Sequence, residues 1–167
     1  MVDFFLNNKK VKAQGNETIW QVAKKNGIVL PHLCFSDKPG YRADGNCRAC
    51  MVSVEGERVL AASCIRKPSE GMKVFTNDER SEKSRKMILE LLVTDQPEKA
   101  NCHDPDSHFW KVADDLNVNE SRFDKRDKKD IPESDNSHVA MAVNLDACIH
   151  CNLCVRACRE VQVNDVI

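Results

Sequence analysis

Residues 34–64 read CFSDKPGYRADGNCRACMVSVEGERVLAASC, and the prediction of the fold depends most on these residues. Its four cysteines follow the spacing Cys34-x12-Cys47-x2-Cys50-x13-Cys64. The first three lie in a predicted loop rich in Gly, Asp and Pro, whereas Cys64 ends a predicted strand. An iron–sulfur cluster needs four converging thiolates, because soft sulfur ligands hold iron. The spacing therefore predicts that these four cysteines bind a [2Fe–2S] cluster.

The composition of the loop supports this prediction. Gly40, Asp44 and Gly45 allow sharp turns that direct backbone N–H groups toward the cluster, and such hydrogen bonds raise its reduction potential. Two other kinds of site fit less well. A four-cysteine zinc site usually shows two close pairs, whereas this set has one pair, Cys47 and Cys50, and two distant single cysteines. A redox C-x-x-C precedes a helix, whereas Cys50 leads into a predicted strand.

The segments around the loop predict an α+β fold. Alternating apolar residues predict a hairpin over residues 2–14, with its turn at 7–10, and a second hairpin over residues 51–63. Helical spacing followed by Gly27 predicts a helix over residues 18–26, and a short strand is expected at residues 74–75. This order of elements is that of a β-grasp ferredoxin domain over residues 1–78.

The second half of the chain is predicted to contain three further segments. A helical segment covers residues 79–118, with a first helix at 79–93 and a short second helix that ends near Leu116. A charged linker follows at 119–138, and its mixed-sign run, residues 124–130, is typical of a solvated loop. Structure is expected to resume near Ala140, within a partial ferredoxin domain over residues 139–167. The apolar stripe of the first helix is predicted to comprise Met87, Ile88, Leu91 and Leu92.

A second cysteine group lies near the C-terminal end of the sequence. Residues 148–158 read CIHCNLCVRAC, which is the C-x2-C-x2-C-x3-C run of bacterial ferredoxins. This run predicts a [4Fe–4S] site with the ligands Cys148, Cys151, Cys154 and Cys158. His150 is interpreted as a surface residue or a neighbour of the site. Arg156 is left open between contact with an anionic cluster and exposure to solvent, and exposure is favoured for Arg159.

The [4Fe–4S] site is expected to be incomplete in this sequence. In two-cluster ferredoxins the first three cysteines of such a run bind one cluster and the fourth binds the other. Nine residues follow Cys158, and none of them is cysteine. Val161, Val163, Val166 and Ile167 suggest the start of an unpaired strand. A longer polypeptide or a partner is therefore expected to complete this part, and a single cluster that uses Cys158 is the alternative.

Composition excludes several classes of function. The formal net charge of −1 over 167 residues indicates neither a nucleic-acid-binding protein nor a strongly acidic one. No apolar run approaches the ~20 residues of a membrane span, and no export signal is visible, so a cytoplasmic protein is expected. The nine cysteines then favour metal binding over disulfides. The absence of nucleotide-binding and nucleophile–base motifs predicts no catalytic site within the chain.

Three motifs carry a family resemblance. They are Pro31-His32-Leu33-Cys34, Gly45-Asn46-Cys47-Arg48-Ala49-Cys50-Met51-Val52 and Ala62-Ser63-Cys64. Over roughly residues 1–93 the chain resembles the [2Fe–2S] domain of the large iron–sulfur subunit of respiratory complex I, which also occurs in NAD-linked hydrogenases and formate dehydrogenases. Residues 40–45 and 159–167 look most similar to the N-terminal part of the α subunit of cytosolic NAD-dependent formate dehydrogenase.

The resemblance implies an electron relay within a multi-subunit oxidoreductase. Formate oxidation at a molybdopterin centre would supply electrons to flavin and NAD, all on other domains or subunits. The alternative is the diaphorase iron–sulfur subunit of an NAD-reducing hydrogenase or a complex I-like module, and a remote one is a zinc-stabilised interaction module. Much of the family carries a further cluster held by one His and three Cys. Here that region offers Cys102, His103 and His108, so this cluster is expected to be absent.

Overall fold

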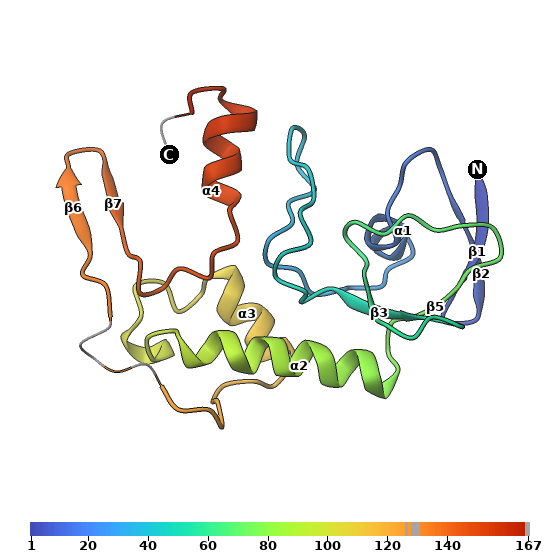
Figure 1. Cartoon of the computed structure of the whole chain (residues 1–167), viewed down its shortest axis with the longest axis horizontal. Coiled ribbons are helices and arrows are strands. Elements are labelled where there is room, and N and C mark those ends of the chain that lie inside the picture. The colour runs from blue at the N-terminus through green and yellow to red at the C-terminus, as the bar shows by residue number, and fades with distance from the viewer. Residues whose placement is uncertain (126, 128–130, 166–167) are drawn as a thin grey trace. The chain divides into compact units, whose positions relative to one another are not determined.

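The computed structural model describes residues 1–125, 127 and 131–165 (Figure 1). The chain divides into two units. One comprises Met1–Arg85 together with Cys151–Ile167, and the other comprises Lys86–His150. No helix among the described residues is long and apolar enough to cross a membrane. The predicted charged run lies partly outside the described residues, at Arg126 and at 128–130.

A mixed five-stranded sheet organises the first unit (Figure 1). Its order is β2-β1-β5-β3-β4, and the central pair β1–β5 is parallel whereas the other pairs are antiparallel. The strands are β1 (Val2–Leu6), β2 (Lys9–Ala13), β3 (Met51–Val54), β4 (Ala61–Ala62) and β5 (Lys73–Phe75). Both predicted hairpins and the predicted closing strand are thus confirmed.

Two details of the hairpins differ from the prediction. The first turn is shorter than expected, since Asn7 and Asn8 alone form it, with φ of 49° and 67°. Asparagine tolerates this left-handed region, and two such residues make the tight turn that suits a twisted hairpin. The second hairpin is weaker than expected. The hairpin was predicted over 51–63, but its return strand comprises only Ala61–Ala62, and Val59 before it is 65% exposed.

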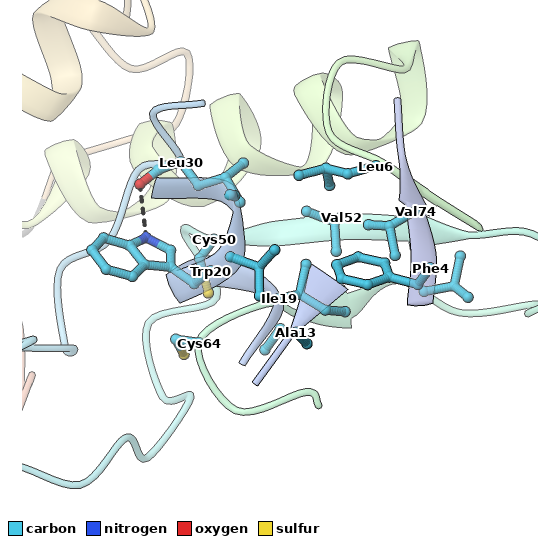
Figure 2. Packing of buried hydrophobic residues seen from close by; sticks show 14 of the residues in the cluster. Phe4, Leu6, Ala13, Ile19, Trp20, Leu30, Cys50, Val52, Cys64 and Val74 are labelled. Carbon is cyan, nitrogen blue, oxygen red and sulfur yellow. Dashed lines mark hydrogen bonds between the residues drawn. The ribbon is translucent and has the colours of Figure 1, made fainter. Parts of the chain in front are cut away.

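Helix α1 (Ile19–Lys25) packs onto the sheet and confirms the predicted helix. Thr18 caps its first turn: the Thr18 hydroxyl accepts from the Gln21 N–H while the Gln21 side chain accepts from the Thr18 N–H. The helix buries Ile19 and Trp20 in a cluster with Phe4 and Val52 (Figure 2). The Trp20 indole N–H donates to the Leu30 carbonyl over 3.0 Å, which anchors the segment that leads into the cysteine loop.

Helix α2 (Glu79–Thr94) confirms the second predicted helix but corrects its buried face. The residues with the lowest exposure recur every four positions and are Ser81, Arg85, Leu89 and Val93. Leu91, which was predicted to lie in the apolar stripe, is 49% exposed. The other three predicted stripe residues, Met87, Ile88 and Leu92, are half-buried, so the buried face is displaced toward Leu89 and Val93. The Arg85 guanidinium is buried through hydrogen bonds to the Thr76 and Ser81 carbonyls.

Among its described residues, the second unit contains four short elements, of which one helix contributes buried apolar residues. They are η1 (Lys99–Asn101), α3 (His108–Asp115), β6 (Asp135–His138) and β7 (Met141–Val143). Helix α3 confirms the predicted short helix, and its apolar residues Phe109, Trp110, Val112 and Ala113 are all buried. Strand β6 begins at Asp135, earlier than the expected Ala140, and pairs with β7 as an exposed antiparallel hairpin.

The C-terminal segment is helical as far as Val161, where the start of a strand was expected. It forms α4 (Leu153–Arg156) followed by the π-helical turn η3 (Ala157–Val161). Val161 therefore ends a helical turn, and Val163 has a φ of 57°, which no strand residue adopts. Val166 and Ile167 lie outside the described residues. The apolar residues of this segment were read as a strand because a short apolar run does not distinguish the two structures.

Candidate iron–sulfur centre

The four cysteines of the first group all lie in the unit that contains the sheet. Cys34 follows α1 and the segment that Trp20 holds through the Leu30 carbonyl. Cys47 lies in the loop, Cys50 directly precedes β3, and Cys64 follows β4. Cys34, Cys50 and Cys64 are at most 1% exposed, and Cys47 is half-buried. Cys50 and Cys64 lie at the end of the hydrophobic cluster near Trp20 (Figure 2). The fold thus brings together thiols that are up to thirty positions apart in the sequence.

Cys34 and Cys47 form the first pair of thiols. The Cys34 N–H donates to the Cys47 sulfur over 3.5 Å, and the Cys47 N–H donates to the Cys34 sulfur over 3.3 Å. The two side chains also hydrogen-bond to each other. Backbone N–H groups stabilise the thiolate form of a cysteine, which is the form that binds metal. The predicted approach of backbone N–H groups to the sulfurs is therefore present at this pair.

Cys50 and Cys64 form the second pair. Their thiols hydrogen-bond to each other, and Ser63 holds the two chain segments together. The Ser63 hydroxyl donates to the Cys50 carbonyl over 2.7 Å, and the Ser63 N–H donates to the same oxygen over 3.2 Å. Ser63 is fully buried and was not identified as a site residue from the sequence, although it stands next to Cys64.

The hydrogen bonds within each pair separate the pKa values of the two thiols. The thiol of Cys34 lowers the pKa of Cys47 to about 6, and this effect exceeds the opposing effect of burial. The thiol of Cys64 likewise lowers the pKa of Cys50 to about 6. The pKa values of Cys34 and Cys64 are raised by their donation to these partners and then by burial. Within each pair, the thiolate form is therefore favoured at the thiol that accepts the hydrogen bond, Cys47 in one pair and Cys50 in the other.

Two loop positions need an unusual backbone. Gly45 has a φ of 67°, and a Cβ there would lie 2.9 Å from the Ile65 side chain. Arg48, between Cys47 and Cys50, has a φ of 58°, although it is not glycine. This local bend accompanies a hydrogen bond from the Ala49 N–H to the Cys47 sulfur. The predicted role of Gly45 in a sharp turn is consistent with this geometry.

The paired arrangement fits a two-iron cluster. Four cysteines hold the two irons of a [2Fe–2S] centre, and two adjacent pairs of thiols offer two ligands to each iron. A structural zinc ion would instead draw its ligands around one point. Cys34, Cys47, Cys50 and Cys64 could therefore hold a [2Fe–2S] cluster.

The cysteine of the middle segment lies in the other unit. The Cys102 thiol donates to the Lys99 carbonyl over 3.1 Å, at the end of η1. His108 begins α3, and His103 precedes it in the connecting turn. The expectation that this region lacks a histidine-ligated cluster stays a prediction.

The second cysteine run is divided between the two units. Cys148 belongs to Lys86–His150, whereas Cys151, Cys154 and Cys158 belong to the unit of the sheet. Cys154 is exposed, and the other three are half-buried. His150 is exposed, as one of its two interpretations required, and its N–H donates to the Cys148 sulfur over 3.4 Å. The [4Fe–4S] site and its four ligands stay a prediction.

The two arginines of this run differ sharply in burial. Arg156 is 3% exposed, and its guanidinium reaches the cysteine loop. The side chain of Arg159 is 57% exposed and pairs with Asp165, which confirms its predicted exposure. The sequence left the role of Arg156 open, because nothing local to it signals burial.

Comparison with known proteins defines the class to which the first domain belongs. Residues 1–79 match the family described as the 2Fe-2S iron-sulfur cluster binding domain. That span contains all four paired cysteines and the whole five-stranded sheet. The chain therefore contains a [2Fe–2S] ferredoxin domain built from a mixed sheet and helices.

Its relatives are subunits of NAD(P)-linked oxidoreductases. The chain is 30% identical over 165 residues to the NADH-ubiquinone oxidoreductase 75 kDa subunit of Reclinomonas americana, an alignment that covers 96% of the chain and 23% of that subunit. It is 29% identical over 176 residues to the NADP-reducing hydrogenase subunit HndD of Solidesulfovibrio fructosivorans, covering 100% of the chain and 29% of that subunit. The chain thus spans less than a third of these curated relatives.

A solved structure resembles the chain over nearly its whole length. The crystal structure of an NAD+-reducing [NiFe]-hydrogenase in the H2-reduced state contains a chain that superimposes with a TM-score of 0.86 and 26% sequence identity. The match covers 98% of this chain and 68% of that one. The resemblance to the complex I and hydrogenase subunits is thereby confirmed at the level of the ferredoxin domain.

Proposed function

We propose that Cys34, Cys47, Cys50 and Cys64 hold one [2Fe–2S] cluster, and that the chain is an electron-transfer module of an NAD-linked oxidoreductase. The observation that carries this proposal is the arrangement of four thiols in two hydrogen-bonded pairs, inside a domain that matches the 2Fe-2S family. A bound [2Fe–2S] cluster accepts and donates one electron at a time.

The residues of the chain would prepare the site for this role. Cys47 and Cys50, whose pKa values are lowered, would supply thiolates most readily, and Cys34 and Cys64 would lose their protons on binding iron. Backbone N–H groups of Cys34, Cys47 and Ala49 donate to the thiol sulfurs, which stabilises added negative charge. Burial by Trp20 and its neighbours excludes water from Cys50 and Cys64.

Spectroscopy of the purified chain tests the cluster. We expect a brown protein that contains two irons and two sulfides per [2Fe–2S] centre, with a rhombic electron paramagnetic resonance signal after reduction. A colourless protein that contains stoichiometric zinc would instead support the zinc-stabilised interaction module and overturn the proposal.

For the parent enzyme, we propose the N-terminal part of the α subunit of a formate dehydrogenase. The support is the resemblance of residues 40–45 and 159–167, together with the presence of Cys102 as the single cysteine between 65 and 147. Molybdopterin, flavin and NAD would bind to other domains or subunits, and the protein would work in the cytoplasm. The remaining cysteine run would hold a [4Fe–4S] cluster that other parts of the enzyme complete.

A hydrogenase or complex I-like module is the second candidate. The superposition on the NAD+-reducing [NiFe]-hydrogenase chain supports it, as does the identity to HndD and to the 75 kDa subunit. Purification of the tagged chain with its natural partners distinguishes the candidates. NAD+ reduction that requires formate supports the dehydrogenase, whereas reduction that requires hydrogen supports the hydrogenase module.

A further inference from the structure

Arg156 is the charged side chain that joins the second cysteine run to the loop of the first. It lies at the end of α4, between Cys154 and Cys158, and is 3% exposed. A charged side chain is rarely buried to this extent unless it is paired and hydrogen-bonded, because loss of hydration is costly. The hydrogen-bond and ion-pair partners of Arg156 therefore indicate its role.

Three of these partners belong to the cysteine loop. Arg156 Nη2 donates to the Cys34 carbonyl over 2.5 Å, and Nη1 donates to the Arg42 carbonyl. Arg156 Nε lies 3.2 Å from the Asp44 carboxylate. The planar guanidinium thus holds both ends of residues 34–44 at once, which the point charge of a lysine does not do.

The remaining contacts of the guanidinium tie it to its own segment. Arg156 Nη2 also donates to the Cys151 carbonyl over 3.1 Å, and Nε donates to the Asn152 carbonyl over 3.3 Å. A single side chain therefore touches the backbone of a cysteine in each of the two groups, Cys34 and Cys151. Both segments lie in the same unit of the structure.

Two further contacts strengthen this junction. Arg42 pairs with Asp44 within the loop and with Glu160 of η3, where Arg42 Nε lies 2.8 Å from the carboxylate. Gly40 closely approaches Val161: a Cβ at Gly40 would lie 3.4 Å from a Val161 methyl group. The loop is thus fitted to the C-terminal segment along residues 40–44.

We propose that Arg156 is a positioning residue that fixes the Cys34–Asp44 loop and raises the reduction potential of the cluster. The inference rests on the proposed ligands Cys34, Cys47, Cys50 and Cys64. A buried cation bonded to the carbonyl of a ligand favours the cluster state with more negative charge, because net charge and hydrogen bonds set the potential of such centres. The second cysteine run thereby influences the first centre through α4.

The test compares R156Q and R156K with R159Q in the full chain. Arg159 is the matched control, because it is an arginine three positions away whose partner Asp165 lies in the same exposed segment. Iron content and the reduced-state resonance signal are measured first. A wild-type chain without a [2Fe–2S] signal would refute the proposed function itself, independently of Arg156.

Redox titration of the resonance signal then measures the potential. We expect R156Q to shift the reduction equilibrium about tenfold toward the oxidised cluster, which corresponds to ~59 mV for a one-electron couple. R156K should recover part of the shift, and R159Q should match the wild type. R156Q with full iron content and an unchanged potential would overturn the proposal.

Hydrogen exchange of the cluster-free proteins provides a second readout. We expect faster exchange at residues 34–48 in R156Q and unchanged exchange in β1 and α1. Because this measurement uses the cluster-free proteins, it also tests the positioning role of Arg156 in a variant that does not keep its cluster. Exchange that rises equally in β1, α1 and the loop would show a general loss of structure and overturn the positioning role.

Discussion

The backbone N–H of Cys34 donates to the sulfur of Cys47, and the N–H of Cys47 donates back to the sulfur of Cys34. These two reciprocal hydrogen bonds join the ends of the loop from Cys34 to Cys47 without a metal ion. The Cys50–Cys64 pair repeats the arrangement through its thiols and through Ser63. The geometry of the ligands is therefore organised by the polypeptide itself.

Replacement of one thiol should remove the first cluster. We expect C47A to lose the rhombic resonance signal of the reduced protein, because one iron would keep only Cys34 from its pair. C102A serves as the matched control, since Cys102 lies in the other unit and bonds to the Lys99 carbonyl. An undiminished signal in C47A would contradict the ligand assignment, and the loss of four irons in C102A would contradict the absence of a histidine-ligated cluster.

The thiol of Cys47 should be reactive at neutral pH in the cluster-free protein. Its pKa is lowered to about 6 by the hydrogen bond from Cys34, against about 8.5 for an ordinary cysteine. We expect its alkylation rate by iodoacetamide, followed by mass spectrometry, to increase through pH 6 and to level off above pH 7. The pH at which the alkylation rate reaches half its maximum should be higher in C34A than in the wild type. A wild-type midpoint near pH 8.5 would contradict the pairing of the two thiols.

Asp78 should stabilise the start of α2. Its carboxylate accepts from the Ser81 N–H over 3.3 Å and from the Ser53 hydroxyl over 2.7 Å, which links the helix to β3. We expect D78A to lower the free energy of unfolding by about 1–2 kcal/mol in urea denaturation followed by circular dichroism. D78N, which keeps a capping oxygen, should lose less. Equal stability of D78A and the wild type at pH 7 would contradict the cap.

The contribution of Asp78 should also depend on pH. Burial alone would raise the pKa of Asp78, but the hydrogen bonds from Ser81 and Ser53 together hold it below its ordinary value. A group whose pKa is lowered by folding stabilises the protein above its unfolded value, about 3.9, and loses this effect as the pH falls through its folded value. The difference between D78A and the wild type should therefore be the same at pH 7 and pH 5 and should decrease below pH 4.

The isolated chain should keep the first cluster and lack a stable second one. We expect Cys148, Cys151 and Cys154 to offer three ligands to one [4Fe–4S] centre and Cys158, after the x3 spacing, to serve another centre. We expect iron analysis and Mössbauer spectroscopy to show full occupancy of the [2Fe–2S] site and a C-terminal site that is empty, substoichiometric or oxygen-labile. A fully occupied, stable [4Fe–4S] cluster that disappears in C158A would contradict this expectation.

The local features of this protein could be predicted from the sequence alone. The alternation of Val2, Phe4 and Leu6 predicted a strand, the helical spacing before Gly27 predicted α1, and the cysteine spacing predicted a loop that leads into β3. These features follow from backbone geometry within a few residues, so neighbours in the sequence are sufficient to reveal them. The four candidate ligands could be named for the same reason.

The pairing of the thiols and the burial of two arginines became evident only in the folded chain. Cys50 meets Cys64 because β3 pairs with β4; the sequence predicted this hairpin but not which thiols would form pairs. Arg85 and Arg156 are buried because backbone carbonyls receive their hydrogen bonds; those of Arg85 lie four and nine positions away, whereas the bond from Arg156 to Cys34 spans 122 positions. An apolar scale places such residues in solvent, since the groups that compensate their charge are adjacent only after the chain has folded.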